Sequence, residues 1–352
     1  AAYHPSYEYS NNLGVELSAV NRVEQQLIGQ RLPGVSVLSV PDRNNFCVRM
    51  FRIYGRLQGG GMIHRFVFHN DRVQPVDQVR LSPGQAGLLN GWGLFTTARI
   101  YEGIPFAFER HWKRLERDAE RTHCPFPFQE NVVRGQLHEL LRANKVSEGA
   151  ARVYVVYNQV GFWRSDENFP RVDLILCSAD LPSYREPARL GLREHGRYAA
   201  SPLAGVKVLS WLDNVWNYYE AQQAGFDEVV LLNERGEVAE CTAANIFCVK
   251  GQRVTTPPVT AGCLQGITRS VLLEIGASVG APVEERTLRP EDLYAADEVF
   301  ISSTNRSMLG VSEINGHQIV DAPGPVTFKL EKAFGAFVRQ YLEAHSATAR
   351  QR

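Results

Sequence analysis

Lys207 stands apart from the other lysines because of the apolar sequence around it. The chain has six lysines, and five of them lie in charged or polar stretches typical of a protein surface: Lys113, Lys145, Lys250, Lys329 and Lys332. Lys207 lies instead within the apolar run Ala204-Gly-Val-Lys-Val-Leu-Ser-Trp-Leu212. Withdrawal from water disfavours the ammonium form, lowers the pKa of a lysine and makes its amine a nucleophile suited to Schiff-base chemistry. The alternative is an edge strand whose lysine extends outward to solvent.

Glu240 is a carboxylate near the end of an expected strand, Glu237–Cys241, which forms a hairpin with Glu228–Leu232. The sequence that follows, Thr242-Ala-Ala-Asn245 and then Ile246-Phe-Cys-Val249, is first small and then apolar. A carboxylate that enters apolar surroundings needs a cationic or protonated partner, or it takes up a proton. In the alternative interpretation, Glu240 is an ordinary strand-end glutamate in water.

A phosphate-binding turn is predicted where Gly262-Cys-Leu-Gln-Gly-Ile-Thr-Arg269 introduces a helix expected over Ser270–Val279. Free backbone N–H groups, the Thr268 hydroxyl and the positive end of the helix dipole all suit an anion. Ser302-Ser-Thr304 is a second hydroxyl-rich turn, and Arg114 could add a bidentate contact to a phosphate. In the alternatives, the threonine is a common helix cap and Arg114 is one of several exposed helix charges.

These residues together form a chemically coherent set. An amine, a carboxylate and a phosphate cradle are the groups needed to hold an aldehyde cofactor that carries a phosphate and a basic ring nitrogen. The carboxylate keeps the ring nitrogen protonated, and the ring then accepts the electron pair of a carbanion next to the imine. A binding module without enzymatic activity, in which Lys207 and Glu240 form a buried ion pair, is the competing hypothesis from a different class.

Two domains are expected to position this set. A small α+β domain is predicted over residues 62–181, a linker over 182–188, a larger αβ domain over 189–345 and a tail over 346–352. The small domain is expected to contain four strands, marked by alternation, and two helices, marked by apolar spacings of three and four: strands Arg65–His69, Leu94–Tyr101, Arg152–Tyr157 and Val172–Cys177, helices Glu109–His123 and Gln129–Lys145.

The larger domain alternates strand and helix. A helix after Lys207 is expected to begin with Asp213 as its N-cap and to close at Gly225. The domain is expected to close with a helix whose apolar residues share one face: Leu330, Phe334, Phe337, Val338, Tyr341 and Leu342.

Residues 1–61 differ from the rest of the sequence in composition and in hydrophobic periodicity. They are polar and turn-rich, end in Gly59-Gly60-Gly61 and precede strongly periodic sequence that begins at Met62. One interpretation is a poorly structured N-terminal extension or a mis-assigned tail, with Met62 as the true start. The alternative is an ordinary N-terminal subdomain.

The composition excludes several classes of protein. The 38 basic and 38 acidic residues cancel, so the electrostatic signature of a nucleic-acid or anionic-membrane binder is missing. No apolar stretch is long enough for a transmembrane helix, and the first thirty residues contain no signal-peptide pattern. The six cysteines are scattered without Cys-x-x-Cys spacing, so we expect neither a disulfide framework nor a metal site, and we expect a cytoplasmic location.

The same residues carry a resemblance to the class IV (fold type IV) pyridoxal-phosphate enzymes, which include branched-chain and D-amino-acid aminotransferases and aminodeoxychorismate lyase. The resemblance covers about residues 65–316 and rests on the order of these elements: Phe95-Thr-Thr-Ala-Arg99, His111-x-x-Arg114, Lys207, Glu240-Cys-Thr-Ala-Ala-Asn-Ile-Phe247, Thr256-Pro-Pro258, Gly266-Ile-Thr-Arg269, Glu285-Arg286, Ala296-Asp-Glu-Val-Phe300 and Ser303-Thr304.

The resemblance implies a two-domain α/β and α+β fold, a homodimer, and pyridoxal 5'-phosphate as cofactor. By this resemblance Lys207 would form the Schiff base and move the substrate proton, Glu240 would pair with the pyridine nitrogen and Leu264 would pack against the ring. The residues that would hold the phosphate are Arg114, Ile267, Thr268 and Thr304. The implied activity is transfer of an amino group between an amino acid, with branched-chain amino acids among the candidates, and a 2-oxo acid.

Three departures from the family pattern leave the substrate open. Ser210 stands where the family usually has asparagine, and Tyr154-Val-Val-Tyr157 replaces the Tyr-x-Arg element usual in branched-chain enzymes. The loop Asn158-Gln-Val-Gly-Phe-Trp-Arg164 also lacks the Arg-x-His pair of the D-amino-acid enzymes. The group that binds the substrate carboxylate is therefore unassigned, and aminodeoxychorismate lyase, which releases pyruvate, is the alternative activity.

Overall fold

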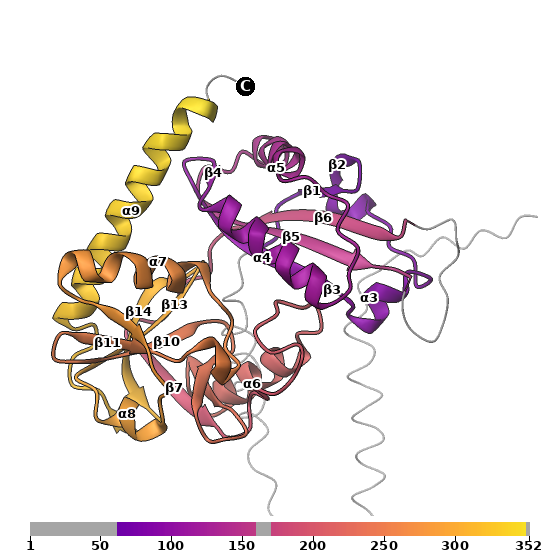
Figure 1. Ribbon diagram of the computed structural model, residues 1–352. Coiled ribbons are helices and arrows are strands. Elements are labelled where there is room, and N and C mark those ends of the chain that lie inside the picture. Colours follow the sequence, from indigo (N-terminus) through magenta and orange to yellow (C-terminus); the bar gives the residue numbers. More distant parts are fainter. Residues whose placement is uncertain (1–61, 160–169, 350–352) are drawn as a thin grey trace, which may run out of the picture. The chain divides into compact units, whose positions relative to one another are not determined.

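The computed structural model describes residues 62–159 and 170–349 (Figure 1). The predicted extension at residues 1–61 lies outside the described residues. Residues 55–352 cluster into one compact unit, and its described part contains two β-sheets. Within the two described ranges, no helix combines the length and the apolar character that crossing a membrane requires.

The first sheet has six strands in the order β2-β1-β6-β5-β3-β4. Every neighbouring pair in it is antiparallel. The strands are β1 (Phe66–His69), β2 (Arg72–Pro75), β3 (Gly93–Tyr101), β4 (Ile104–Pro105), β5 (Gly149–Tyr157) and β6 (Val172–Ala179). The four strands predicted in this part of the sequence are therefore confirmed as β1, β3, β5 and β6.

Two long helices pack on one face of this sheet, α4 (Phe108–Arg121) and α5 (Glu130–Asn144), as their apolar spacing predicted. Alternate side chains of β3 and β5 point into the core beneath them, among them Leu94 and Val153. Because successive strand residues point to opposite faces, Phe95 and Arg152 lie on the other face of the sheet. A short helix, α3 (Ala86–Asn90), precedes β3.

The second sheet has nine strands in the order β12-β11-β10-β13-β14-β7-β8-β9, with β15 paired to β14. Its parallel pairs are β11 with β12, β7 with β14 and β7 with β8. The strands are β7 (Ala188–Arg193), β8 (Glu228–Leu232), β9 (Val238–Cys241), β10 (Asn245–Lys250), β11 (Arg253–Thr256), β12 (Val283–Glu285), β13 (Glu298–Ser303), β14 (Ser307–Ile314) and β15 (His317–Gln318).

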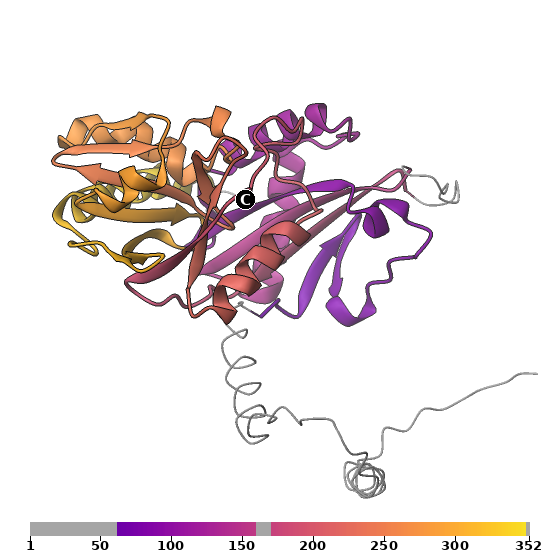
Figure 2. The ribbon, with the colours of Figure 1, turned by 90° about the horizontal axis from the view of Figure 1, so that it is seen from below.

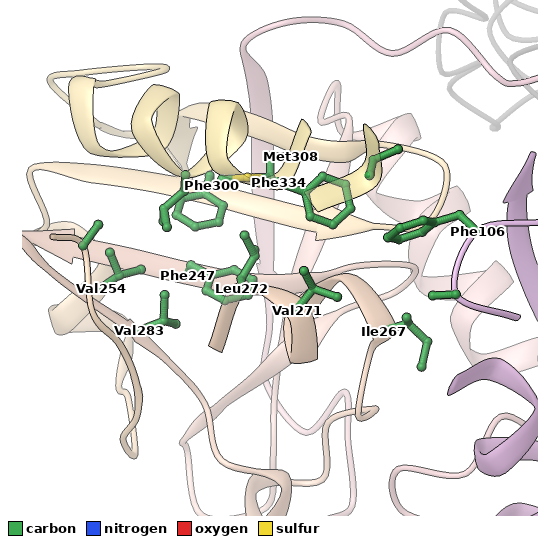
Figure 3. Packing of buried hydrophobic residues seen from close by; sticks show 14 of the residues in the cluster. Phe106, Phe247, Val254, Ile267, Val271, Leu272, Val283, Phe300, Met308 and Phe334 are labelled. Carbon is green, nitrogen blue, oxygen red and sulfur yellow. The ribbon is translucent and has the colours of Figure 1, made fainter. Parts of the chain in front are cut away.

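Both faces of the nine-stranded sheet are buried. Phe247 and Phe300 stack at 4.6 Å on the face covered by α7 (Ile267–Ile275) and α9 (Pro325–Ala349), as Figure 3 shows. Ile246 and Ile301 point to the other face, where α8 (Pro290–Tyr294) contributes to a second core. The uninterrupted apolar runs of β10 and β13 follow from this two-sided burial.

Phe106 joins the two sheets. It lies between β4 and α4, yet its ring contacts Phe334 at 5.8 Å and Tyr341 at 5.1 Å on α9. Tyr341 also donates a hydrogen bond of 2.8 Å to Glu109 on α4. Figures 1 and 2 accordingly show the six-stranded part, indigo to magenta, beside the nine-stranded part, red to yellow. The helix α9 continues into the predicted tail as far as Ala349.

Two predicted helix starts are wrong. The helix after Lys207, α6 (Leu212–Gln223), begins after Trp211, so Asp213 lies in its first turn and is not the N-cap. The helix after the Gly-rich turn begins at Ile267, with Gly266 as N-cap, and not at Ser270. Neither N-cap residue forms a side-chain capping bond. Tertiary contacts hold the loop before each helix: Ser210 Oγ donates to the Gly91 carbonyl at 2.9 Å, and Asn245 Nδ2 donates to the Leu264 carbonyl at 2.8 Å.

Candidate functional site

One cavity of about 700 Å³ collects all seven residues predicted for the site. They come from two helices, one strand of the nine-stranded sheet and three loops. Those residues are Arg114 on α4, Lys207 in the loop before α6, Glu240 on β9, Leu264 before α7, Ile267 and Thr268 in the first turn of α7, and Thr304 after β13. The fold thus brings Arg114 and Thr304, which are 190 positions apart in the sequence, into the lining of one cavity.

The amine of Lys207 lies in an aromatic niche within this cavity. Its Nζ is 4.4 Å from the centroid of the Phe95 ring and 5.6 Å from that of Trp211. Burial, with the positive charge of Arg114 as the next largest cause, lowers the pKa of Lys207 to about 7, against the opposing effect of Glu240. The other five lysines are exposed, so the distinction drawn from their local sequences is confirmed.

Glu240 is buried, and protein donors already bind both of its oxygens. Arg197 Nε donates a hydrogen bond of 3.0 Å to Oε1, and the backbone N–H of Leu264 donates one of 3.0 Å to Oε2. Asn214 accepts a second bond of 3.0 Å from the Arg197 guanidinium. Protein donors therefore fix the carboxylate where it lines the cavity, and the alternative of a glutamate in water is wrong.

The start of α7 forms an anion-binding corner of the cavity. Gly266 precedes the helix, and a Cβ at this position would lie 2.1 Å from Asn245 Oδ1, so any larger residue would displace the Asn245 side chain. The backbone N–H groups of Ile267 and Thr268 belong to the first turn, which a helix leaves without internal partners. Arg114 lines the same cavity, and its side chain is buried rather than exposed.

Arg114 is held by the strand beneath it. Its Nη2 donates to Thr96 Oγ1 at 2.9 Å, and its Nη1 donates to the Gln265 carbonyl at 3.2 Å. Thr96 Oγ1 also lies 2.8 Å from His111 Nδ1, and burial holds the pKa of His111 well below its usual range. A neutral His111 can therefore accept a hydrogen bond from the Thr96 hydroxyl. The oxygen of the same hydroxyl accepts a hydrogen bond from Arg114. Burial also lowers the pKa of Arg114 to about 10, which leaves it charged at neutral pH.

Two buried polar atoms at the cavity wall have no hydrogen-bond partner within the described ranges. They are Ser302 Oγ and Asn305 Oδ1, which flank Thr304 at the end of β13. A buried polar group without a partner is destabilising unless a ligand or water satisfies it. These atoms, with the α7 corner, are the features expected where a polar, anionic ligand binds.

Arg152 is a cavity residue that the sequence analysis did not select. It projects from β5 on the same face as Tyr154, whose hydroxyl accepts a bond of 3.0 Å from Arg152 Nη1. Tyr154 stacks on Phe95 at 5.8 Å, so this arginine lies near the aromatic niche of Lys207. Arg197 and Arg306 pair with glutamates, whereas Arg152 has no carboxylate partner among the described residues. The strand period alone would have placed Arg152 and Tyr154 on one face.

The family model for class IV amino-transferases matches residues 93–314. A putative branched-chain-amino-acid aminotransferase of Methanocaldococcus jannaschii is 33% identical over 279 residues, which is 76% of this chain and 94% of that protein. An aminodeoxychorismate lyase of Bacillus subtilis is 26% identical, over 80% of this chain and 98% of its own. The crystal structure of a branched-chain aminotransferase from Thermoproteus uzoniensis superposes with a TM-score of 0.72 at 26% identity, covering 81% of this chain and 98% of that one.

The chain belongs to the class IV aminotransferase family. The predicted family and the predicted two-domain α/β and α+β fold are therefore confirmed. The family uses pyridoxal phosphate. The family match also makes the chain an enzyme, so the hypothesis of a binding module is wrong.

Proposed function

We propose that the protein is a pyridoxal 5'-phosphate-dependent aminotransferase that moves an amino group between an amino acid and a 2-oxo acid. Branched-chain amino acids are the first candidate donors. The observation that carries the proposal is the meeting, in one cavity, of the Lys207 amine, the anionic Glu240 and the anion-binding corner at α7. The matched relatives named as aminotransferases support it.

The residues of the cavity fit this cofactor. Arg114, the Ile267 and Thr268 backbone and the Thr304 hydroxyl would bind its phosphate, and the unpartnered Ser302 Oγ marks the same region as one that requires a polar ligand. The bound cofactor supplies an aldehyde that reacts with amines and a ring that accepts the electron pair left at the substrate α-carbon. Leu264 would pack against that ring.

Lys207 and Glu240 would divide the proton chemistry. With its pKa near 7, the Lys207 amine can both take a proton from the substrate α-carbon and return it at neutral pH. Glu240, held by Arg197 and by the Leu264 N–H, would keep a proton on the ring nitrogen. Phe95 and Trp211 exclude water around the amine.

Arg152 is our candidate for the substrate carboxylate. It is the cavity arginine on the face of β5 opposite the core, and its charge acts on Lys207. An arginine beside the tyrosine hydroxyl of Tyr154 offers a carboxylate both a charge and a directed hydrogen bond. This assignment would explain how the chain binds an amino acid without the Tyr-x-Arg or Arg-x-His elements of other family members.

The second candidate activity is that of aminodeoxychorismate lyase, in which the same lysine would drive release of pyruvate. The Bacillus subtilis relative with this name, which matches over 80% of the chain, supports it. The stretch Phe95-Thr-Thr-Ala-Arg99, whose residues line the cavity in part, resembles that branch as well.

A half-reaction separates the two activities. The purified protein is loaded with pyridoxal phosphate and mixed with one amino acid at a time, without an oxo acid, and its absorbance is recorded. Conversion to the pyridoxamine spectrum with L-leucine is the expected result, with D-leucine as the stereochemical comparison. Pyruvate release from aminodeoxychorismate without that conversion would establish the lyase instead.

We also propose a homodimer, on the basis of the family resemblance, and a cytoplasmic location, on the basis of the scattered cysteines. The five cysteines that the described ranges contain are free, which suits a reducing compartment. Sedimentation equilibrium of the purified protein measures the assembly state, and a monomer at all concentrations would contradict the dimer.

A further inference from the structure

The loop that carries Lys207 has little structure of its own. Between β7 and α6 the chain forms only short turns, such as the bond from Val206 N–H to the Leu203 carbonyl of 3.1 Å. The position of the Lys207 backbone must therefore come from the surfaces on which the loop lies. The first part of the loop contacts the nine-stranded part, where the Arg197 N–H donates a bond of 3.0 Å to the Leu232 carbonyl. The residues next to Lys207 lie instead against the six-stranded part.

One of these surfaces is strand β3. The Phe95 N–H donates a bond of 3.0 Å to the Lys207 carbonyl, and the Leu209 N–H donates one of 2.9 Å to the Gly93 carbonyl. Leu94 and Val208 form an isolated antiparallel bridge. These contacts add the loop to β3 as a short extra strand segment but leave the Lys207 N–H without a strand partner.

The other surface is helix α4, which supplies that partner. The Lys207 N–H donates a bond of 3.1 Å to Oδ2 of Asp118, a carboxylate that is only 1% exposed. One turn further, Arg121 Nη2 donates to the carbonyls of Pro202 and Ala204 at 2.8 and 2.9 Å. The residues at 114, 118 and 121 share one face of α4. The helix rise places Arg114 and Asp118 about 6 Å apart along the axis.

We propose that Asp118 is a positioning residue for Lys207: its buried carboxylate fixes the lysine backbone at a set distance from the phosphate-binding Arg114 on the same helix. The inference rests on the proposed function in taking Lys207 as the cofactor lysine. The single rigid helix α4 then sets the spacing between the phosphate end and the amine end of the cofactor.

A carboxylate is well suited to this task. It accepts hydrogen bonds only, so it must turn an acceptor toward the Lys207 N–H, and a charged acceptor forms a stronger bond than a neutral one. Arg117 offsets the cost of burial by donating to Oδ1 through Nε at 3.1 Å and Nη2 at 2.7 Å. The sequence contains this pair as adjacent Arg117-Asp118, with no signal of what lies 89 positions away.

Asp118 also acts on the charge of the amine. The groups that face Lys207 are Arg114 on the same helix, Arg152 on β5, Glu240 on β9 and Asp118 itself. The two arginines favour the neutral amine, and the two carboxylates favour the ammonium form. Removal of the Asp118 charge should therefore lower the Lys207 pKa further below about 7.

Hydrogen exchange in the cofactor-free protein tests the anchor directly. We expect Asp118→Ala to speed amide exchange in the peptide spanning residues 203–211 by roughly tenfold or more, because a charge-assisted bond is lost, while β10 and β13 stay protected. Asp118→Asn keeps an acceptor for the Lys207 N–H, and the partly exposed Arg117 can turn away from the new NH₂ group, so exchange should stay within about threefold of the wild type. Glu120→Ala, an exposed carboxylate on the same helix, is the matched control.

Two further measurements keep the test decisive. Pyridoxal phosphate should bind Asp118→Ala about tenfold more weakly than the wild type, and competitive acylation should give Asp118→Asn a lower Lys207 pKa. Unchanged exchange in Asp118→Ala, or an unchanged lysine pKa in Asp118→Asn if Asp118→Ala does not fold, would overturn the proposal. If the wild type binds no pyridoxal phosphate, the proposed function is refuted. If Asp118→Ala still exchanges residues 203–211 faster than that wild type, the role of Asp118 in positioning Lys207 stands.

Discussion

The acid end and the amine end of the cavity, at Glu240 and Lys207, are built in different ways. Glu240 lies on β9, a strand whose residues are all buried, and the nine-stranded sheet determines its place. Lys207 lies in an irregular loop whose place depends on a few hydrogen bonds to β3 and α4. The acid is therefore part of the core, whereas the amine is docked against it.

This difference has a functional consequence. A group that protonates a ring nitrogen needs one fixed position, and a sheet provides it. An amine that must reach both a cofactor and a substrate proton benefits from a loop that small changes can adjust. Substitutions at the amine end should therefore change chemistry without unfolding the protein, and substitutions at the acid end should affect both.

The largest expected effect is at the amine end. Lys207→Ala should reduce transamination by more than about 10⁴-fold, because both the covalent attachment and the proton transfer depend on this amine. The protein should remain folded and colourless with pyridoxal phosphate. Steady-state rates and visible absorbance measure both effects, with Lys113→Ala on the exposed face of α4 as the control. Substantial remaining activity would assign the chemistry to another amine.

At the acid end, Glu240→Gln should lower kcat by about 10²- to 10³-fold while cofactor still binds, because the ring nitrogen loses its anionic partner. Both glutamate oxygens accept bonds from Arg197 and Leu264, so the new NH₂ group must face one of these donors. That mismatch should cost about 1–3 kcal/mol of stability. Thermal unfolding separates the two effects, and an unchanged kcat would contradict the assigned role.

The residues of the site differ in how far the sequence predicted them. Lys207 and Glu240 became candidates because each puts a charge into or next to apolar sequence, a pattern that the local sequence shows, and the family resemblance then favoured them over their alternatives. Asp118 and Arg152 were not recognisable, because the role of each depends on residues that are distant in the sequence and that only the fold brings near. The helix starts at Leu212 and Ile267 were missed for a similar reason, since loop docking decided them rather than capping residues.

A smaller effect is expected at the wall between the two ends. Arg152→Gln should raise the KM for amino acids about 5- to 30-fold with little change in kcat, because it removes one charge-assisted bond to the carboxylate at a partly solvated site. Arg142→Gln, an exposed arginine on α5, is the matched control. If KM stays unchanged in Arg152→Gln, the substrate carboxylate is bound by another group.

The effect furthest from turnover concerns the stability of the cofactor-free protein. The Lys207 pKa is about 7 in the folded state against the usual 10.5, so between these pH values the unfolded chain binds a proton that the folded chain does not. The free energy of unfolding should therefore rise with pH across this window, by at most about 1.4 kcal/mol per unit, and this contribution is lost as pH falls toward 7. Urea unfolding of the wild type and Lys207→Met at pH 7.5, 8.5 and 9.5 (values chosen to lie roughly within the window) measures it. The wild type should gain stability relative to Lys207→Met as pH rises, whereas Lys113→Met should follow the wild type. A constant difference between wild type and Lys207→Met would show that docking the loop does not withdraw the amine from water.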